Sequence, residues 1–242
     1  MSHPARARGL RLIAVLALTG FACNGAIPGL ESLDGLLAGA GAGSDSQVVA
    51  GLREALSVGT RNAVAQTSRP GGYLDDPALR IKLPGALDDL ARGLRAVGYG
   101  PQVDELYVAM NRAAERSAAE AGDVFLTGIR QMSISDAMGI LDGGDTAATE
   151  FFERTTRDTL FQRFEPIVTE KLGQVGAAQQ YDSLVSRFDA IPFTDKPDLD
   201  LDHYVTNKAL DGLFETLGAE ESKIRRDPAA RVTPLLKEVF GP

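Results

Sequence analysis

From residue 46 onward, apolar residues recur at the spacing of an α-helix, and this repetition limits the fold more than any other feature. Val49, Leu52 and Leu56 are three or four residues apart, which places them on one face of a helix. Glycine, proline and aspartate clusters separate similar stretches. The sequence therefore predicts an all-α fold with helices at about 46–68, 87–98, 101–114, 122–132, 134–141, 145–164, 166–175, 177–189 and 202–225, and a last short one near 234.

One stretch of the domain, at about 70–84, lacks the helical period. It begins with a proline and two glycines, which should end the first helix. Leu79, Ile81 and Leu83 then alternate with charged residues, a period of two that is typical of extended chain. Because no partner strands are evident, a sheet is not expected. We predict a compact, bundle-like single domain with one extended arm that crosses a helical surface.

The first 22 residues have the layout of a secretory signal peptide. Three arginines precede an uncharged apolar run from Leu12 to Phe21, and no acidic residue occurs before Glu31. The run is too short to span a bilayer, which needs roughly 20 apolar residues. Cys23, the one cysteine in the chain, follows Ala22 at the expected cleavage position. The stretch resembles the leader of a bacterial lipoprotein, in which that cysteine is acylated.

Two outcomes of cleavage remain open. Lipidation of Cys23 would anchor the protein to a membrane, and Asn24 after it favours the periplasmic face of the outer membrane under the enterobacterial sorting rule. Plain cleavage after the small-x-small sequence Gly20-Phe21-Ala22 would instead give a soluble periplasmic or secreted protein. We expect the lipid anchor, because plain cleavage leaves a free thiol at the new terminus.

Residues 23–46 are rich in glycine and alanine and are predicted to form a flexible tether behind the lipidated cysteine. Leu30, Leu33 and Leu36 do have helical spacing, so a short docking helix is the alternative. The expected organisation is a signal peptide at 1–22, the tether at 23–46 and an all-helical domain at 47–242.

Charge and cysteine content exclude several classes of function. The chain carries 25 basic and 33 acidic residues, a net charge of −8, and loss of the leader leaves 22 against 33, or −11. An acidic surface argues against nucleic acid as a partner. A single cysteine rules out a disulfide framework and a cysteine-rich zinc site. No serine-hydrolase, zinc-protease or nucleotide-binding motif is present, and no cofactor is expected.

Three acidic residues, Asp198, Asp200 and Asp202, alternate like the first half of a calcium-binding loop. The match fails at its sixth and twelfth positions, where His203 and Ala209 stand in place of glycine and glutamate. These aspartates are therefore a weak candidate metal site. The alternative is that they cap the helix that follows, because carboxylates accept bonds from its free N–H groups.

Two further groups are weak candidates for an anion or ligand site. One is the turn Asp142-Gly143-Gly144-Asp145, whose glycines could present backbone N–H groups to an anion unless Asp145 caps the next helix itself. The other is a basic cluster that could meet lipid phosphates or merely complement a helix dipole; it consists of Lys223, Arg225, Arg226 and Arg231. The adjacent pair Glu220 and Glu221 is interpreted as a solvated helix edge.

Several blocks of sequence together resemble the bacterial family called domain of unknown function 4197 (DUF4197). The blocks are 51–60, Pro70-Gly71-Gly72-Tyr73-Leu74, Ile81-Lys82-Leu83-Pro84-Gly85, Asn111-Arg112-Ala113-Ala114-Glu115, 140–149, 208–214 and 224–231, and the similarity covers about 30–241. The resemblance implies one all-helical domain in exported proteins, often lipoproteins. It implies no activity and carries over no functional residue.

Three functions are compatible with these observations. The first is a membrane-tethered, non-catalytic interaction or structural module of the cell envelope, with an envelope protein as partner. The second is a carrier of a lipid or acyl chain, which requires an enclosed apolar cavity of several hundred Å³. The third is a carboxylate-based, metal-assisted enzyme, which requires two of the loops at 75–76, 142–145 and 198–202 to converge in one cleft.

Overall fold

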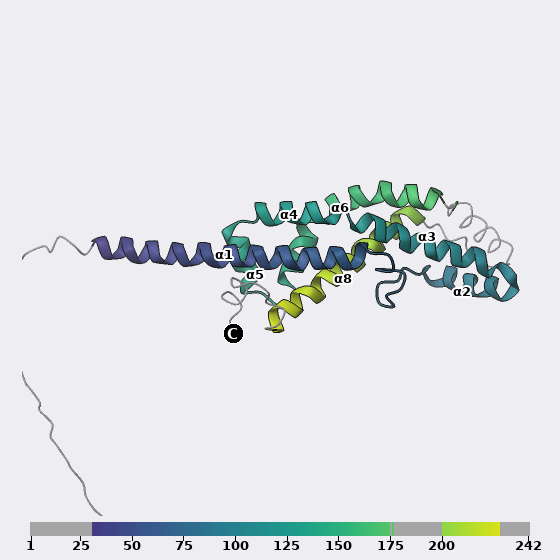
Figure 1. Cartoon of the computed structure of the whole chain (residues 1–242), viewed down its shortest axis with the longest axis horizontal. Helices are drawn as coiled ribbons and strands as arrows, with labels where there is room; N and C mark the ends of the chain where they lie inside the picture. Colours follow the sequence, from purple (N-terminus) through teal and green to yellow (C-terminus); the bar gives the residue numbers. More distant parts are fainter. Residues whose placement is uncertain (1–30, 175, 177–199, 228–242) are drawn as a thin grey trace, which may run out of the picture. The chain divides into compact units, whose positions relative to one another are not determined.

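The computed structural model describes residues 31–174, 176 and 200–227 (Figure 1). The chain divides into two compact units, residues 1–41 and 42–242. The helix α1 (Glu31–Ser68) begins in the first unit, where residues 31–41 are helical. The second unit contains the rest of α1 and the elements α2 (Gly85–Leu94), η1 (Arg95–Tyr99), α3 (Gly100–Ala118), α4 (Ala121–Gln131), α5 (Ile134–Leu141), α6 (Ala147–Gln174) and α8 (Leu201–Arg226). The described residues contain no strand, which confirms the all-α prediction.

The first helix starts earlier than the sequence suggested. A flexible coil was expected up to residue 46, whereas α1 is helical from Glu31, in keeping with the alternative of a helix there. Once a helix is nucleated, each added residue gains a hydrogen bond; the alanines of this stretch favour the extension, and its glycines oppose it. Cys23 and the leader lie outside the described residues.

The other helix boundaries follow the punctuation of the sequence. α1 ends at Ser68, just before Pro70. η1 joins α2 to α3 through a kink at Gly98, whose φ of 97° lies in the left-handed region that glycine adopts without strain. α3 begins at Gly100 with Pro101 in its first turn, where a missing N–H costs nothing. α4, α5 and α8 also match their predicted ranges to within one residue.

α6 is one helix, although two were predicted, ending at 164 and beginning again at 166. Pro166 lies inside it, where a proline removes one backbone hydrogen bond. Phe164 and Val168, on either side of the proline, are fully buried. Their packing continues across the weak point, because tertiary burial outweighs local propensity. The helices predicted at 177–189 and near 234 lie outside the described residues.

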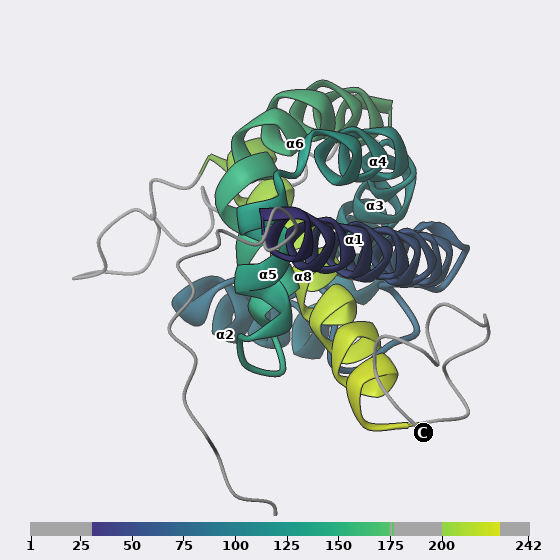
Figure 2. The same ribbon diagram turned by 90° about the vertical axis from the view of Figure 1, so that its left-hand side faces the viewer.

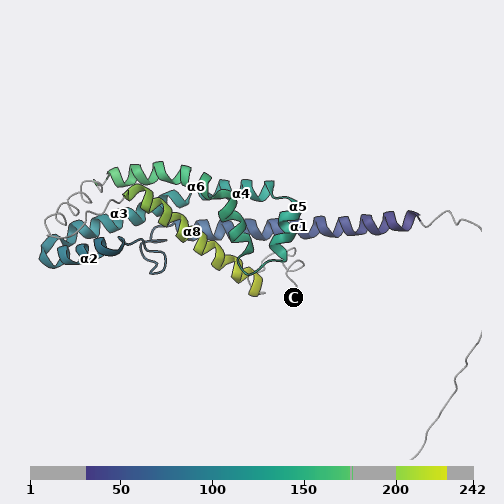
Figure 3. The same ribbon diagram turned by 180° about the vertical axis from the view of Figure 1, so that it is seen from behind.

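α6 is the central helix of the core, since it packs against α3, α4, α5 and α8. Figure 2 shows α4 beside α6, and Figure 3 shows α2 lying along the first half of α3. Phe125 of α4 makes edge-to-face contacts with Phe152 of α6 and Phe214 of α8, at ring centroid distances of 5.5 and 6.0 Å. None of the helices described is long and apolar enough to cross a membrane.

The arm between α1 and α2 has the predicted alternation. Leu79, Ile81 and Leu83 are buried, whereas Arg80 and Lys82 between them are exposed. The chain is a series of turns as far as residue 79 and is irregular and extended at 80–84, without a strand partner. Its backbone polar groups therefore need partners from elsewhere in the protein.

Candidate functional site

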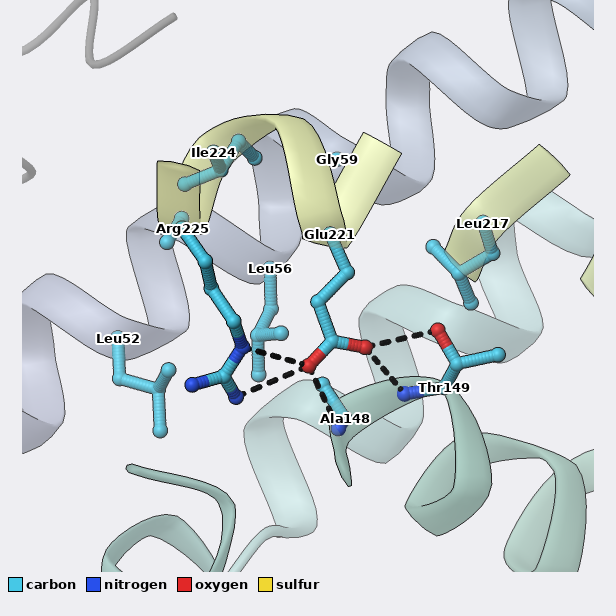
Figure 4. A pocket seen from close by; sticks show the side chains of 10 residues that line it. Leu52, Leu56, Gly59, Ala148, Thr149, Leu217, Glu221, Ile224 and Arg225 are labelled. Atoms are coloured by element: carbon cyan, nitrogen blue, oxygen red, sulfur yellow. Dashed lines mark hydrogen bonds and ion pairs between the residues drawn. The ribbon is translucent and has the colours of Figure 1, made fainter. Parts of the chain in front are cut away.

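A small pocket lies where the first turn of α6, the last turns of α8 and the middle of α1 meet (Figure 4). Glu221 of α8 is at its centre, with only 7% of the residue exposed. One carboxylate oxygen accepts a hydrogen bond from the Ala148 backbone N–H at 2.9 Å. The other accepts from the backbone N–H and the hydroxyl of Thr149, both at 2.8 Å. Glu221 thus caps α6 from a different helix.

Arg225, one turn further along α8, completes this arrangement. Its guanidinium binds the Glu221 carboxylate through two nitrogens, at 3.0 and 2.9 Å, and donates to the Ile140 carbonyl oxygen at the end of α5 at 2.8 Å. The side chains of Arg225 and Glu221 are 13% and 7% exposed, so the ion pair is largely shielded from water. Removing one partner of such a pair leaves an uncompensated buried charge.

The rest of the pocket wall is apolar and comes from Leu52, Leu56, Gly59, Leu217 and Ile224. The cavity volume is about 20 Å³. A cavity needs roughly 10–15 Å³ to hold one water molecule, so this pocket holds little more than that. The pocket lies between three helices and has no room for an acyl chain.

A second buried carboxylate, Glu115 of α3, holds the arm. A single oxygen of Glu115 accepts hydrogen bonds from the backbone N–H groups of Gly71, Tyr73 and Leu74, at 3.0, 3.3 and 3.1 Å. The other oxygen pairs with Arg112, one turn before it, at 2.5 Å. Glu115 thus supplies the hydrogen-bond acceptor that the backbone N–H groups at 71–74 lack within the arm.

Asn111 holds the extended part of the arm in the same way. Its side-chain oxygen accepts from the Ile81 N–H at 2.8 Å, and its amide donates to the Ile81 carbonyl at 3.0 Å. One side chain therefore pairs with both backbone groups of Ile81, as a neighbouring strand would. The block 111–115, which the sequence analysis singled out by resemblance, serves as the anchor of the arm.

Tyr73 connects the arm to α8. Its hydroxyl donates to the Ala209 carbonyl oxygen at 2.5 Å, and its ring is completely buried. Burial, with smaller contributions from the charges of Asp211 and Glu115, raises the pKa of Tyr73 far above its usual value. At Gly212 a Cβ atom would lie 2.6 Å from the Tyr73 ring, so α8 requires a glycine there.

The candidate anion site at 142–145 is not what the sequence suggested. Asp145 forms an ion pair with Arg226. The N–H groups at the start of α6, which have no partner within the helix, donate to Glu221. The prediction that Asp145 caps this helix is therefore wrong. So is the interpretation of Glu221 as part of a solvated edge, because burial depends on what packs against the helix. Gly143 and Gly144 form the turn after α5; at Gly143 a Cβ would lie 2.5 Å from the Ala147 Cβ.

The described members of the basic cluster have acidic partners inside the chain. Lys223 lies 3.6 Å from Glu220, Arg225 binds Glu221, and Arg226 pairs with Asp145. Arg231 lies outside the described residues. These pairs do not assemble the three cations into one anion site.

The two described aspartates of the candidate metal site act as hydrogen-bond acceptors. Asp200 caps α8 by accepting from the His203 N–H at 3.0 Å, and Asp202 accepts from the Thr169 hydroxyl at 2.7 Å. Asp198 lies outside the described residues. Within the part of the chain that is described, no three metal-binding side chains come together. His203 packs against Phe161, with ring centroids 4.9 Å apart.

Sequence reasoning did not select Glu115 or Glu221, the two carboxylates that organise the core. Their partners are 41–44 and 72–73 residues away along the chain. No local spacing reveals such contacts. The one sequence signal for a buried carboxylate is a charged residue within an apolar stripe. Many exposed charged residues occur in the same pattern, so the signal does not distinguish them.

Comparison with known proteins adds one finding. No curated protein and no solved structure is significantly similar to the chain. The family described as "Protein of unknown function (DUF4197)" matches residues 42–241, which include the arm, both buried carboxylates and every helix after α1 among the described residues. The chain therefore belongs to the DUF4197 family.

Proposed function

We propose that this protein is a bacterial envelope lipoprotein, tethered to the periplasmic face of the outer membrane through Cys23, that acts as a non-catalytic interaction module. The observation that carries the proposal is the use of its buried charges. Together, Glu115 and Glu221 accept six hydrogen bonds, five from backbone N–H groups and one from the Thr149 hydroxyl. Each also pairs with an arginine one turn away. These groups hold segments of the protein together.

The size of the pocket at Glu221 favours an interaction module over a carrier. A lipid or acyl carrier needs an apolar cavity of several hundred Å³. The pocket at Glu221, whose wall is mainly apolar, has a volume of about 20 Å³. The larger hollows are open clefts lined by charged and hydroxyl side chains as well as apolar ones.

The loops that an enzyme would use are engaged separately. Asp76 accepts from the Ala78 N–H at 2.9 Å within its own turn, Asp145 pairs with Arg226, and Asp200 caps α8. General acid–base catalysis by two carboxylates requires both to reach one bond. Local engagement of each carboxylate therefore favours a structural role.

Native mass spectrometry of the protein purified from its own envelope tests the module against the carrier. We expect a bare polypeptide that carries only the mass of an N-terminal lipid modification. An acyl ligand bound in addition at stoichiometric yield would overturn the module in favour of the carrier.

Metabolic labelling with palmitate tests the anchor separately. The wild-type protein should incorporate label, and the variant Cys23→Ser should not. The variant Ser46→Ala, altered at the far end of the expected tether, is the matched control and should be labelled like the wild type. Labelling of Cys23→Ser would refute acylation at this cysteine.

A further inference from the structure

α4 and α6 lie side by side (Figure 2), and neither of the two buried carboxylates lines the open groove between them. Gly128 brings the helices close, since a Cβ atom there would lie 3.4 Å from the Phe152 ring and 3.6 Å from the Thr156 methyl. The groove has a volume of about 460 Å³. This is within the range of roughly 300–1,000 Å³ that is typical of ligand sites.

Two arginines of α6, Arg154 and Arg163, line this groove. Both are exposed, and neither forms an ion pair with a carboxylate in the described part of the chain. The guanidinium of Arg154 lies 5.8 Å from the centre of the Phe151 ring, which restricts its position. In a chain with a net charge of −8, two such arginines in one groove form a local positive site.

Asp136 is the one carboxylate among the described residues that line the groove, and it is already engaged. It accepts from the backbone N–H and the hydroxyl of Ser133, at 3.0 and 2.6 Å, in the capping box of α5. These bonds, with a smaller contribution from Arg154, hold its pKa below the usual value. Asp136 therefore leaves most of the donor capacity of both arginines available.

The positions of the arginines favour a ligand with two separated charges. They are nine residues apart on α6, which corresponds to about 13 Å along the helix axis and about half a turn around it, so the two side chains reach the groove from different sides of the helix. A lipid headgroup or a free phosphate concentrates its charge at one point and would engage one arginine at a time. An extended peptide parallel to α6 rises about 3.3 Å per residue, so carboxylates about four residues apart would match the axial separation of the two arginines.

We propose that the α4–α6 groove binds an acidic, extended peptide segment of a partner protein, with Arg154 and Arg163 each pairing with one carboxylate. Arginine suits this role because its planar fork binds carboxylates through two parallel hydrogen bonds. Between the arginines, Thr155 and Thr159 are exposed along the groove and leave room for a peptide backbone. This inference rests on the proposed function and specifies the chemistry of the partner.

Fluorescence anisotropy with the full chain and a labelled nonapeptide tests the groove. The peptide carries glutamates at its third and seventh positions and is otherwise alanine and serine. We expect saturable binding that Arg154→Gln and Arg163→Gln each weaken by about tenfold or more, the effect of losing a charge-assisted hydrogen bond. Thr159→Glu, which places a negative charge between the arginines, should weaken it similarly.

Matched controls address net charge and folding. Arg116→Gln makes the same charge change on α3, outside the groove, and should leave binding unchanged. Because the altered side chains are exposed, all variants should keep the wild-type melting temperature. A peptide with glutamine in place of both glutamates, and one with the glutamates two residues apart, should bind at least several-fold more weakly.

Four results would overturn the proposal. The first is no saturable binding of the peptide up to about 1 mM, and the second is equal binding by the wild type and the groove variants. The third is a dimer of this chain that the Arg154→Gln/Arg163→Gln double variant abolishes, since a second copy would then occupy the groove. An envelope protein that cross-links equally to wild type and double variant would also refute the groove, while leaving the interaction module intact. An acyl ligand in the native protein would instead refute the module.

Discussion

The two buried glutamates solve different problems with the same chemistry. Glu221 caps a regular helix, whose first N–H groups always lack partners within the helix. Glu115 binds N–H groups of an irregular segment, the arm, which has no ladder or helix to satisfy them. Their arginine partners also differ, because the side chain of Arg225 is 13% exposed and that of Arg112 is 44% exposed.

This difference shows how solvent access sets the consequence of losing a carboxylate. Without Glu115, Arg112 can turn into water and only the turns at 71–74 lose their hydrogen-bond partner, because Asn111 and Tyr73 still hold the rest of the arm. Without Glu221, Arg225 remains shielded beside the Ile140 carbonyl, and α6 loses its cap at the same time. We therefore expect damage at Glu221 to be global and damage at Glu115 to be local.

The largest effect is expected from Glu221→Ala. Removing one partner of a buried ion pair costs about 3–5 kcal/mol, and here the cap of α6 is lost as well. The free energy of unfolding, measured by urea denaturation, should fall by that amount. The control Glu215→Ala, on an exposed face of the same helix, should change it by less than about 0.5 kcal/mol. A loss below about 1 kcal/mol at Glu221 would mean that the pair is not shielded.

A smaller, local effect is expected from Glu115→Gln. The glutamine keeps one carbonyl acceptor but loses the charge that strengthens three backbone hydrogen bonds, at a cost of about 2 kcal/mol. Hydrogen exchange should accelerate at the amides of Gly71, Tyr73 and Leu74 much more than in the core of α6. The variant Glu105→Gln, which alters an exposed residue of the same helix, serves as the control. Uniform acceleration across the protein would contradict the distinction between the two glutamates.

Two glycines of α8 extend the comparison to the packing of the arm. Gly212→Ala would place a Cβ 2.6 Å from the Tyr73 ring, and overpacking of this kind costs about 1–3 kcal/mol. Gly218→Ala meets neighbours only at 3.7 Å or more and should stabilise the helix by about 0.5–1 kcal/mol. The two variants should shift the urea midpoint in opposite directions. A shift in the same direction would show that the arm adjusts around Tyr73.

The smallest effect concerns Tyr107, next to the arm on α3. Burial, together with a hydrogen bond to Asp88, raises its pKa to about 12. The folded protein therefore holds this proton more tightly than the unfolded chain, whose tyrosines titrate near 10. The resulting contribution of Tyr107 to the free energy of unfolding is present below pH 10 and is lost as the pH rises towards 12.

Because Tyr107 is only half buried, we expect this contribution to be less than about 1 kcal/mol. The variant Tyr107→Phe should lose less stability than the wild type between pH 10 and 12, as measured by urea midpoints across that range. Parallel pH profiles of the two proteins would contradict the assigned cause.

Local patterns were enough to predict most of the secondary structure. A helix ends just before Pro70, and the chain kinks at Gly98, because proline and glycine impose or permit these backbone conformations themselves. The alternation of Leu79, Ile81 and Leu83 correctly predicted which side chains of the arm are buried, whereas the chain forms turns as far as residue 79 in place of the extended run expected there. Pro166 was misjudged because the core that carries α6 past it is formed by other helices.

The candidate sites were harder to predict, since they depend on which residues meet in space. Asp145 was predicted as a cap from its position before α6, yet Glu221 takes that place from 72–73 residues away. Arg226, predicted as part of a basic cluster, binds that same Asp145. A charge in a sequence window has no fixed partner, because the partner is chosen by packing.

The sequence by itself determined the helical class, the position of the arm and the membership of the DUF4197 family, since these follow from periodicity, from glycine and proline, and from ordered blocks of residues. Only the tertiary structure decided that two glutamates are buried anchors and that two arginines share a groove. The physical reason is that burial and pairing are long-range properties: they arise when separate helices exclude water from one another, and no single segment contains that information.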